Sequence, residues 1–272
     1  MLNINEIHKP NTLAEALRYL QEPGAVALSG GTQLISVQRL DVSTVVDLSG
    51  LGLSYIRESS GAIGIGATTT LAELCESPIL RAIAGAVIAR AAHGSAANIL
   101  RNQETIAGTL IVEPDGVLAA ALLALDAQAT VVRKDTRNVP LADFLPMRDH
   151  LLMMALLTEI SVPLANPRSS LQTIARTPAD KPIVSVCAAA HYDRTILREV
   201  RIALGGVGET ASRASASEKL LEGQALSTAS VEHAAALAGQ QLSPPGDFRG
   251  SAEYRKEMAI VLTRRALMEL AA

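Results

Sequence analysis

One stretch of the sequence decides how the amino-terminal part folds: Leu28-Ser29-Gly30-Gly31-Thr32-Gln33-Leu34. An apolar run that predicts a buried strand, Ala25–Leu28, precedes it, and helical spacing over residues 34–37 follows it. Glycine permits positive φ and lets backbone amides come close to an anion, which makes this bend a candidate phosphate site. Spacing alone favours the simpler interpretation, a tight strand-to-helix turn without a ligand.

The residues around this bend complete a small unit. Thr12 can cap a first helix and Glu15 can reach back to it, and apolar residues follow at helical spacing. Residues 44–48 form another apolar strand pattern. A strand, a glycine bend, a helix and a strand within so short a length favour parallel pairing, so we expect residues 1–54 to form a first lobe.

Residues 55–165 predict a second lobe of mixed structure. Its expected elements are short β segments such as 63–67, helices over 83–92 and 117–125, and strands over 129–132 and 157–162. The segment from Pro163 to Pro167 follows, and we interpret it as a linker because prolines lack backbone donors.

Residues 166–272 predict a third unit. Two β-rich runs, 183–192 and 196–204, predict an antiparallel hairpin, and three helices are expected at 214–221, 231–240 and 252–270. The last helix carries Arg255, Arg264 and Arg265, which we interpret as solvated charge or a subunit contact. The pattern as a whole predicts the α+β class.

A second glycine-containing bend is expected at Thr105-Ile106-Ala107-Gly108-Thr109, beside Arg101 and Asn102. Two such bends in neighbouring lobes can hold a diphosphate between them and leave a crevice for the rest of a dinucleotide. Ordinary turn chemistry is again the simpler interpretation of the residues by themselves.

The composition excludes several classes of protein. The 272 residues carry a formal net charge of -3, so no basic field draws the chain onto nucleic acid. Hydrophobic residues make up 49% of the chain, but charged residues interrupt every apolar run before membrane-spanning length. The first residues do not form a secretory signal, so we expect a cytoplasmic location and no membrane insertion.

The cysteines and histidines of the sequence do not have the spacing of metal ligands. Cys75 and Cys187 are far apart and lack ligand spacing, so this chain cannot build an iron–sulfur cluster alone. The five histidines are scattered, and we interpret them as structural. The sequence therefore predicts no metal site and no catalytic acid, base or nucleophile.

At the two bends the sequence resembles the medium, FAD-binding subunits of molybdenum hydroxylases, such as those of carbon monoxide dehydrogenase and xanthine dehydrogenase. The resemblance runs over nearly the whole chain, and the order of its motifs makes it specific. Besides the two bends, the motifs are His8–Pro10 with Thr12–Leu17, Gly66–Thr69, Ile99–Asn102, Ala121–Ala127, Pro182–Val186, Ala203–Val207 and Ser251–Lys256.

This resemblance implies a two-lobed FAD-binding domain of the vanillyl-alcohol oxidase type, followed by an α+β carboxy-terminal domain. It also implies electron transfer: a large subunit holds molybdopterin, an iron–sulfur small subunit holds [2Fe–2S] clusters, and FAD here passes electrons to NAD or another acceptor. The residues it assigns to FAD are Ser29, Gly30, Gly31, Thr32, Gln33, Leu34, Thr105, Ile106, Ala107, Gly108, Thr109 and Asp115.

The sequence departs from the family pattern at four positions. Ala107 and Thr109 replace a glycine and an asparagine of the second bend, and a methyl at Ala107 costs about 1 kcal/mol if positive φ is required. Val117 aligns with a family aspartate, for which Asp115 substitutes only in a shifted loop. Gln172 replaces a lysine whose charge would favour anionic reduced flavin.

These departures keep a second hypothesis open, a flavin-free scaffold subunit of the same fold. A third hypothesis, a free-standing flavin reductase, has less support because the sequence shows no acid–base constellation for a hydride acceptor. An absorption spectrum with and without added FAD separates the first two.

Overall fold

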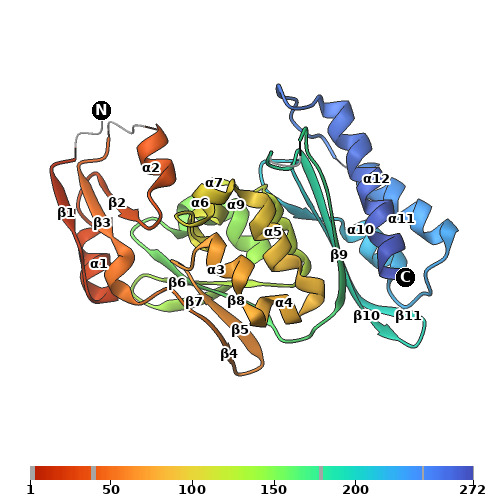
Figure 1. The fold of residues 1–272 in the computed structure, drawn as a ribbon, viewed down its shortest axis with the longest axis horizontal. Helices are drawn as coiled ribbons and strands as arrows, with labels where there is room; N and C mark the ends of the chain where they lie inside the picture. Colours follow the sequence, from red (N-terminus) through yellow and green to blue (C-terminus); the bar gives the residue numbers. More distant parts are fainter. Residues whose placement is uncertain (1–3, 38–40, 178–179, 241, 272) are drawn as a thin grey trace.

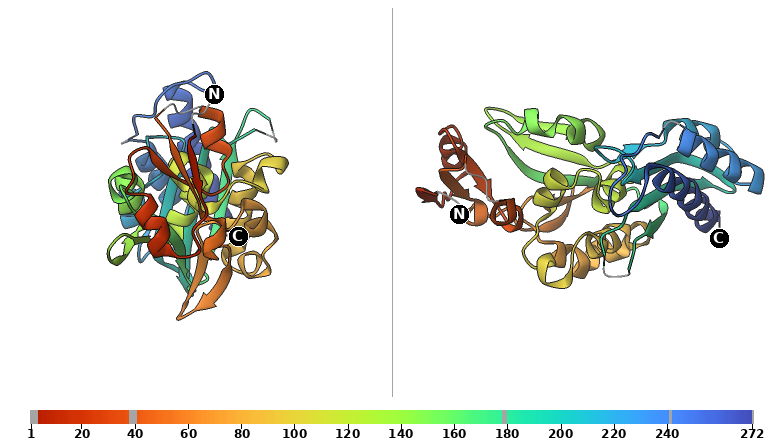
Figure 2. Two further views of the ribbon diagram at one scale, coloured as in Figure 1. Left: turned by 90° about the vertical axis from the view of Figure 1, so that its left-hand side faces the viewer. Right: turned by 90° about the horizontal axis from the view of Figure 1, so that it is seen from above.

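The structure is a computed structural model that describes residues 4–37, 41–177, 180–240 and 242–271. Three β-sheets are arranged along its long axis, with helices on their faces (Figure 1). The first sheet lies at one end, and the carboxy-terminal helices lie at the other (Figure 2). Each sheet falls within one expected segment, and the α+β class is confirmed.

The first sheet has three parallel strands in the order β1-β3-β2. Thr12 caps the first helix by accepting from the amide of Glu15, and the carboxylate of Glu15 accepts from the amide of Asn11. The elements are β1 (Glu6–His8), α1 (Leu13–Tyr19), β2 (Ala25–Leu28), α2 (Thr32–Val37), β3 (Thr44–Asp47) and the 3-10 helix η1 (Leu48–Leu51).

The second lobe contains an antiparallel sheet in the order β4-β5-β8-β6-β7 and the largest hydrophobic core. Every residue of its central helix α8 is buried. The strands are β4 (Ile56–Ser59), β5 (Ala62–Gly66), β6 (Gln128–Val132), β7 (Thr136–Pro140) and β8 (Leu156–Pro163). The helices are α3 (Leu71–Glu76), α4 (Pro78–Ala82), η2 (Ala84–Ala86), α5 (Val87–Ser95), α6 (Asn98–Arg101), α7 (Ile106–Val112), α8 (Val117–Ala124) and α9 (Leu141–Leu151).

The carboxy-terminal sheet is antiparallel, in the order β12-β11-β10-β9. Side chains alternate across β10, so Cys187 and Ala189 join the core around α8, while Val186 and Ala188 join the core under α12. The second lobe and this sheet thus share one buried layer. The elements are β9 (Arg168–Ile174), β10 (Val184–Asp193), β11 (Ile196–Gly205), β12 (Ser212–Arg213), α10 (Ser215–Leu221), α11 (Thr228–Gln240) and α12 (Ala252–Ala271).

Three expectations about local structure are wrong. The helix predicted over 83–92 begins only at Val87, because Ala84, Gly85 and Ala86 have φ values of 43°, 56° and 58° and interrupt it. Residues 25–28 are half-buried, or exposed at Ala27, rather than buried, since β2 is an edge strand. The bend predicted over 105–109 is instead the capped first turn of α7.

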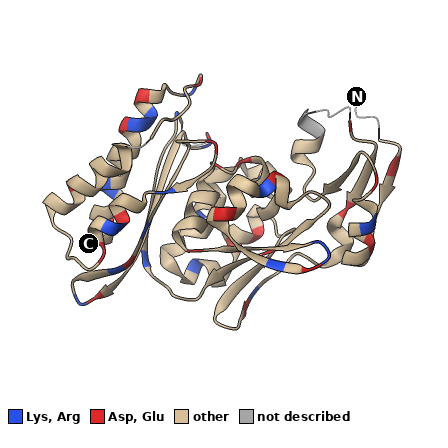
Figure 3. Cartoon of the chain, turned by 180° about the vertical axis from the view of Figure 1, so that it is seen from behind, with Lys and Arg blue, Asp and Glu red and all other residues tan. Residues whose placement is uncertain are grey.

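Charges are mixed along the chain. Figure 3 shows basic and acidic residues interspersed along the visible elements. Among the described residues no single helix has the length and hydropathy to span a membrane, and α7 and α8 reach that mark only as a pair bent by 106°.

Candidate functional site

The first bend joins β2 to α2 and has the geometry that its glycines predict. Gly31 has a φ of +75°, the left-handed region in which a side chain is strained. The amides of Gly30, Gly31 and Thr32 have no hydrogen-bond partner within the described ranges. Successive unpartnered amides at such a bend form a concave group of donors suited to an anion.

In the second segment, residues 105–109, the backbone amides already donate hydrogen bonds within the fold. Thr105 caps α7 by accepting from the amide of Gly108 at 3.2 Å. The amide of Ile106 donates to Thr69 at 2.9 Å, and that of Ala107 donates to Ala67 at 3.2 Å. The expectation that this segment binds mainly through free backbone amides is therefore wrong at these positions, because the fold already uses them.

The two departures in this segment have different consequences. Ala107 is helical and buried, with its methyl in the core, so the expected strain from positive φ does not arise. Thr109 is also buried, but its hydroxyl oxygen has no hydrogen-bond partner in the part of the chain that the structure describes. A buried hydroxyl without a partner costs free energy, which a ligand with a polar group at this place would recover.

The two segments lie against each other. The hydroxyl of Ser29 donates to that of Thr105 across 3.1 Å. A Cβ added at Gly30 would lie 1.9 Å from the carbonyl oxygen of Gln103, so only glycine allows this approach. The free amides of the first bend thus lie next to the start of α7. This donor set fits the diphosphate of a dinucleotide.

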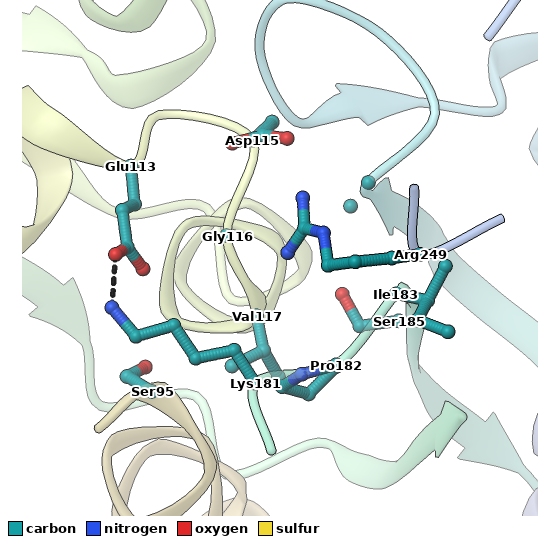
Figure 4. A pocket seen from close by; sticks show the side chains of 12 residues that line it. Ser95, Glu113, Asp115, Gly116, Val117, Lys181, Pro182, Ile183, Ser185 and Arg249 are labelled. Carbon is teal, nitrogen blue, oxygen red and sulfur yellow. Dashed lines mark hydrogen bonds and ion pairs between the residues drawn. The ribbon is translucent and has the colours of Figure 1, made fainter. Parts of the chain in front are cut away.

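A cavity of about 140 Å³ lies between the second lobe and the carboxy-terminal sheet (Figure 4). The cavity lies near the carboxy-terminal end of α7. That end is about seven residues after Thr105, which corresponds to on the order of 10 Å along the helix. Lys181 forms an ion pair with Glu113 at one side, and the guanidinium of Arg249 points in from the other. Asp115, Val117 and Ser185 also line it.

Burial shifts the pKa of two carboxyls, that of Asp115, which lines this cavity, and that of Glu104, which does not. Burial raises the pKa of the Asp115 carboxyl, and the negative charge of Glu113 adds to the increase. Burial also raises the pKa of Glu104, which Lys181 lowers and Glu113 raises. Asp115 lines the cavity beyond the far end of α7.

Two further side chains that the sequence singled out lie outside the cavity lining. Gln172 donates to Glu269 of α12. Arg255 is only 3% exposed, so its interpretation as solvated charge is wrong. It donates to the carbonyls of Ile183 and Gly206 and to the Asp247 carboxylate.

The potential metal ligands are two separate cysteines and a group of one histidine and two glutamates. Cys75 and Cys187 are both free thiols, and burial raises the pKa of Cys187 to about 12. His8 lies 3.1 Å from Glu6 and 3.9 Å from Glu22 in the first lobe, a group that sequence spacing did not show because Glu22 follows α1. Glu6 and Glu22 are exposed, and exposed acidic groups of this kind are common without a metal ion.

Comparison with known proteins assigns the class. Residues 2–165 match the family model of the FAD binding domain in molybdopterin dehydrogenase, and residues 169–270 match that of the CO dehydrogenase flavoprotein C-terminal domain. The chain belongs to the FAD-binding medium subunits of molybdenum hydroxylases, which are subunits of oxidoreductases.

Particular relatives match over almost their full length. The glyceraldehyde dehydrogenase medium chain of Sulfolobus acidocaldarius is 28% identical, with 97% of each chain covered. The 6-hydroxypseudooxynicotine dehydrogenase complex subunit alpha of Paenarthrobacter nicotinovorans is 30% identical, covering 94% of this chain and 91% of that one. A chain of the solved structure of carbon monoxide dehydrogenase from Hydrogenophaga pseudoflava superposes with a TM-score of 0.90 at 28% identity. The match covers 98% of this chain and 97% of that one.

Proposed function

We propose that this chain binds FAD and passes electrons from a partner's [2Fe–2S] clusters to an acceptor such as NAD. The observation that supports it best is the set of free amides at Gly30, Gly31 and Thr32, held against the start of α7 by the Ser29–Thr105 hydrogen bond. Bound FAD would supply electron transfer in single or paired steps, which the side chains of proteins do not provide.

The residues of this chain would bind and position the cofactor rather than react. The first bend would hold the diphosphate through its amides and through Ser29, Thr32, Gln33 and Leu34. Thr109 would add its unpartnered hydroxyl, and Asp115 would act at the far end of the site, in the cavity. No proton transfer by this chain is required for that role.

We further propose that the chain works in a complex with an iron–sulfur small subunit and a molybdopterin large subunit. Two relatives are medium chains of carbon monoxide dehydrogenases, and another is the alpha subunit of a 6-hydroxypseudooxynicotine dehydrogenase complex. The free thiols of Cys75 and Cys187 are too isolated to hold a cluster, so the electrons would have to come from a partner. Co-purification with two such subunits, followed by iron and molybdenum analysis, tests the assembly.

The decisive experiment for the cofactor is an absorption titration of the purified chain with FAD. We expect flavin bands at about one per chain after removal of free FAD, and their loss in Gly31→Asp, which adds a side chain and a negative charge at the bend. Gly208→Asp is a matched control, since Gly208 has ordinary φ and a Cβ there has 3.5 Å of clearance. Absence of flavin bands at saturating FAD would contradict the proposal.

A second candidate function is a flavin-free scaffold subunit of the same fold. The bonded amides of Ile106 and Ala107 favour it, because they leave the second segment with fewer donors for a cofactor. Val117 in place of a carboxylate favours it as well. It predicts a complex that assembles with its partners and contains iron and molybdenum but no flavin.

A further inference from the structure

The first bend rests on the short segment that joins α6 to α7. A Cβ added at Gly30 would lie 1.9 Å from the carbonyl oxygen of Gln103 and 3.3 Å from the Cα atom of Glu104. The amides of Gln103 and Glu104 both donate to the carbonyl of Leu100 in α6, at 2.9 and 2.8 Å. The position of α6 therefore sets the position of the backbone against which the first bend packs.

The helix α6 has little of its own to hold it in place. It has four residues, none of which is buried, and no side chain caps its start. Ile99, its second residue, is 79% exposed, so apolar packing contributes little. A helix this short is unstable without tertiary contacts. A polar interaction has to fix it.

Arg101, the last residue of α6, supplies that interaction. Its Nη1 atom donates to the carbonyl oxygens of His93 and Ala96 at 3.1 and 2.8 Å, and its Nη2 atom donates to Oδ1 of Asn98 at 2.9 Å. His93 lies in the last turn of α5, where carbonyls lack a helical partner and a positive charge is favourable. Since α5 is packed in the largest core, one guanidinium ties α6 to a fixed helix.

The orientation of Arg101 is not that of a surface ion pair. No carboxylate of the described ranges pairs with it, and its bonds go to two backbone carbonyls and one side-chain amide. These three acceptors diverge around the planar fork of the guanidinium, an arrangement that a lysine ammonium does not reproduce.

We propose that Arg101 is a positioning residue of the FAD site: it holds α6, and through α6 the Gln103–Glu104 backbone, where the first bend needs it to bind the diphosphate. The inference rests on the proposed function. Arg101 acts through the backbone and does not have to touch the cofactor. Its loss should therefore affect recognition of the diphosphate and leave the surroundings of the flavin ring, which the ribityl chain separates from the diphosphate, unchanged.

Arg101→Gln and Arg101→Lys in the full chain test the inference. FAD affinity is measured by flavin fluorescence, and ADP, which carries the diphosphate without a flavin ring, is titrated by calorimetry. We expect Arg101→Gln to weaken both ligands roughly tenfold or more. Arg101→Lys keeps the charge and one donor but not the fork, so it should recover part of the loss. The visible spectrum of FAD that still binds should match that of the wild type.

Arg81→Gln is the matched control in the same lobe. Arg81 also donates to a carbonyl at the end of a helix, that of Cys75 after 2.7 Å, but within the described chain it has no hydrogen bond to α6 or to the first bend. Wild-type affinities for FAD and ADP are expected. A loss equal to that of Arg101→Gln would mean a general loosening of the lobe and would overturn the inference.

Urea denaturation shows which variants are folded. Wild-type affinities in folded Arg101→Gln, even with reduced stability, would overturn the inference and leave the proposed function intact, because Arg101 would then only stabilise α6. Weaker FAD binding with unchanged ADP binding would overturn it as well. If Arg101→Gln does not fold, the folded lysine variant decides by the same criteria. A wild-type chain that takes up no FAD contradicts the proposed function and the inference together.

Discussion

The hydroxyl of Ser29 donates to that of Thr105 across 3.1 Å, although 76 residues separate them in the sequence. This bond joins the first lobe to the capped start of α7 in the second lobe. It brings the free amides of the first bend next to the second segment, which is the relationship on which the FAD proposal depends.

Gly30→Ala tests whether FAD binding requires the close approach of Gly30 to the backbone of Gln103. The added methyl carbon would lie 1.9 Å from the carbonyl oxygen of Gln103, so one lobe has to move. We expect a loss of about 1–3 kcal/mol in unfolding free energy and loss of FAD binding. Gly208→Ala, measured by the same urea denaturation and FAD titration, should retain both properties.

Thr105→Ala removes two interactions at once. It deletes the acceptor of the Gly108 amide and the partner of Ser29, for an expected loss of about 1–2 kcal/mol in urea denaturation. Thr105→Ser keeps the hydroxyl and should lose less than half as much. Equal destabilisation of the two variants would show that the methyl group, and not the cap, stabilises this site.

Thr109→Val is expected to act in opposite directions on stability and on binding. Valine has nearly the same shape and removes a buried hydroxyl that lacks a partner in the described chain. Without FAD we expect the variant to be more stable by about 1–2 kcal/mol. If this hydroxyl contacts the cofactor, FAD binds more weakly to the variant. Higher stability with unchanged FAD affinity would remove Thr109 from the site.

The sequence predicted the order of strands and helices where local signals are strong. Thr12 with Glu15 marked the start of α1, and the two β-rich runs over 183–192 and 196–204 marked the β10–β11 hairpin. It missed β9 and α9: the polar residues of β9 hide a strand that pairs with β10, and Pro146 interrupts the helical pattern of α9.

The candidate site was predicted only in part, for a physical reason. The bend at Gly30-Gly31 depends on local backbone freedom, which sequence reports well. The amides of Ile106 and Ala107 donate to the carbonyl oxygens of Thr69 and Ala67. These hydrogen bonds depend on tertiary contacts, which residue spacing cannot show. Ser185 and Arg249 were missed because nothing local distinguishes a serine or arginine that faces a cavity.

Asp115→Asn should change stability with pH. Burial raises the pKa of Asp115 above its ordinary value of 3.8, so its favourable contribution is full below that pH and is lost as pH rises through the higher native pKa. The asparagine variant should therefore melt at a higher temperature than the wild type at pH 8 and at a similar temperature at pH 3.5. Asp193→Asn on the exposed end of β10 is the control for the loss of a carboxylate outside the cavity.

Arg255 should stabilise the wall of the cavity in a way that weakens in acid. Its guanidinium joins the carbonyls of Ile183 and Gly206 to Asp247, and it holds the pKa of Asp247 well below its usual range. A depressed carboxyl pKa stabilises the fold above the ordinary value of 3.8, and this contribution is lost as pH falls through the native pKa.

Arg255→Met leaves two buried carbonyls without their donor, so we expect a loss on the order of 3 kcal/mol at pH 7. The difference from wild type should begin to shrink at pH 2–3, below the ordinary carboxyl pKa of 3.8, because the wild type starts to lose the Asp247 contribution there. Urea denaturation at both pH values measures it, and Arg265→Met on the exposed face of α12 should show neither effect. A difference that stays constant with pH would mean that the carbonyl contacts, and not the Asp247 ion pair, account for the role of Arg255.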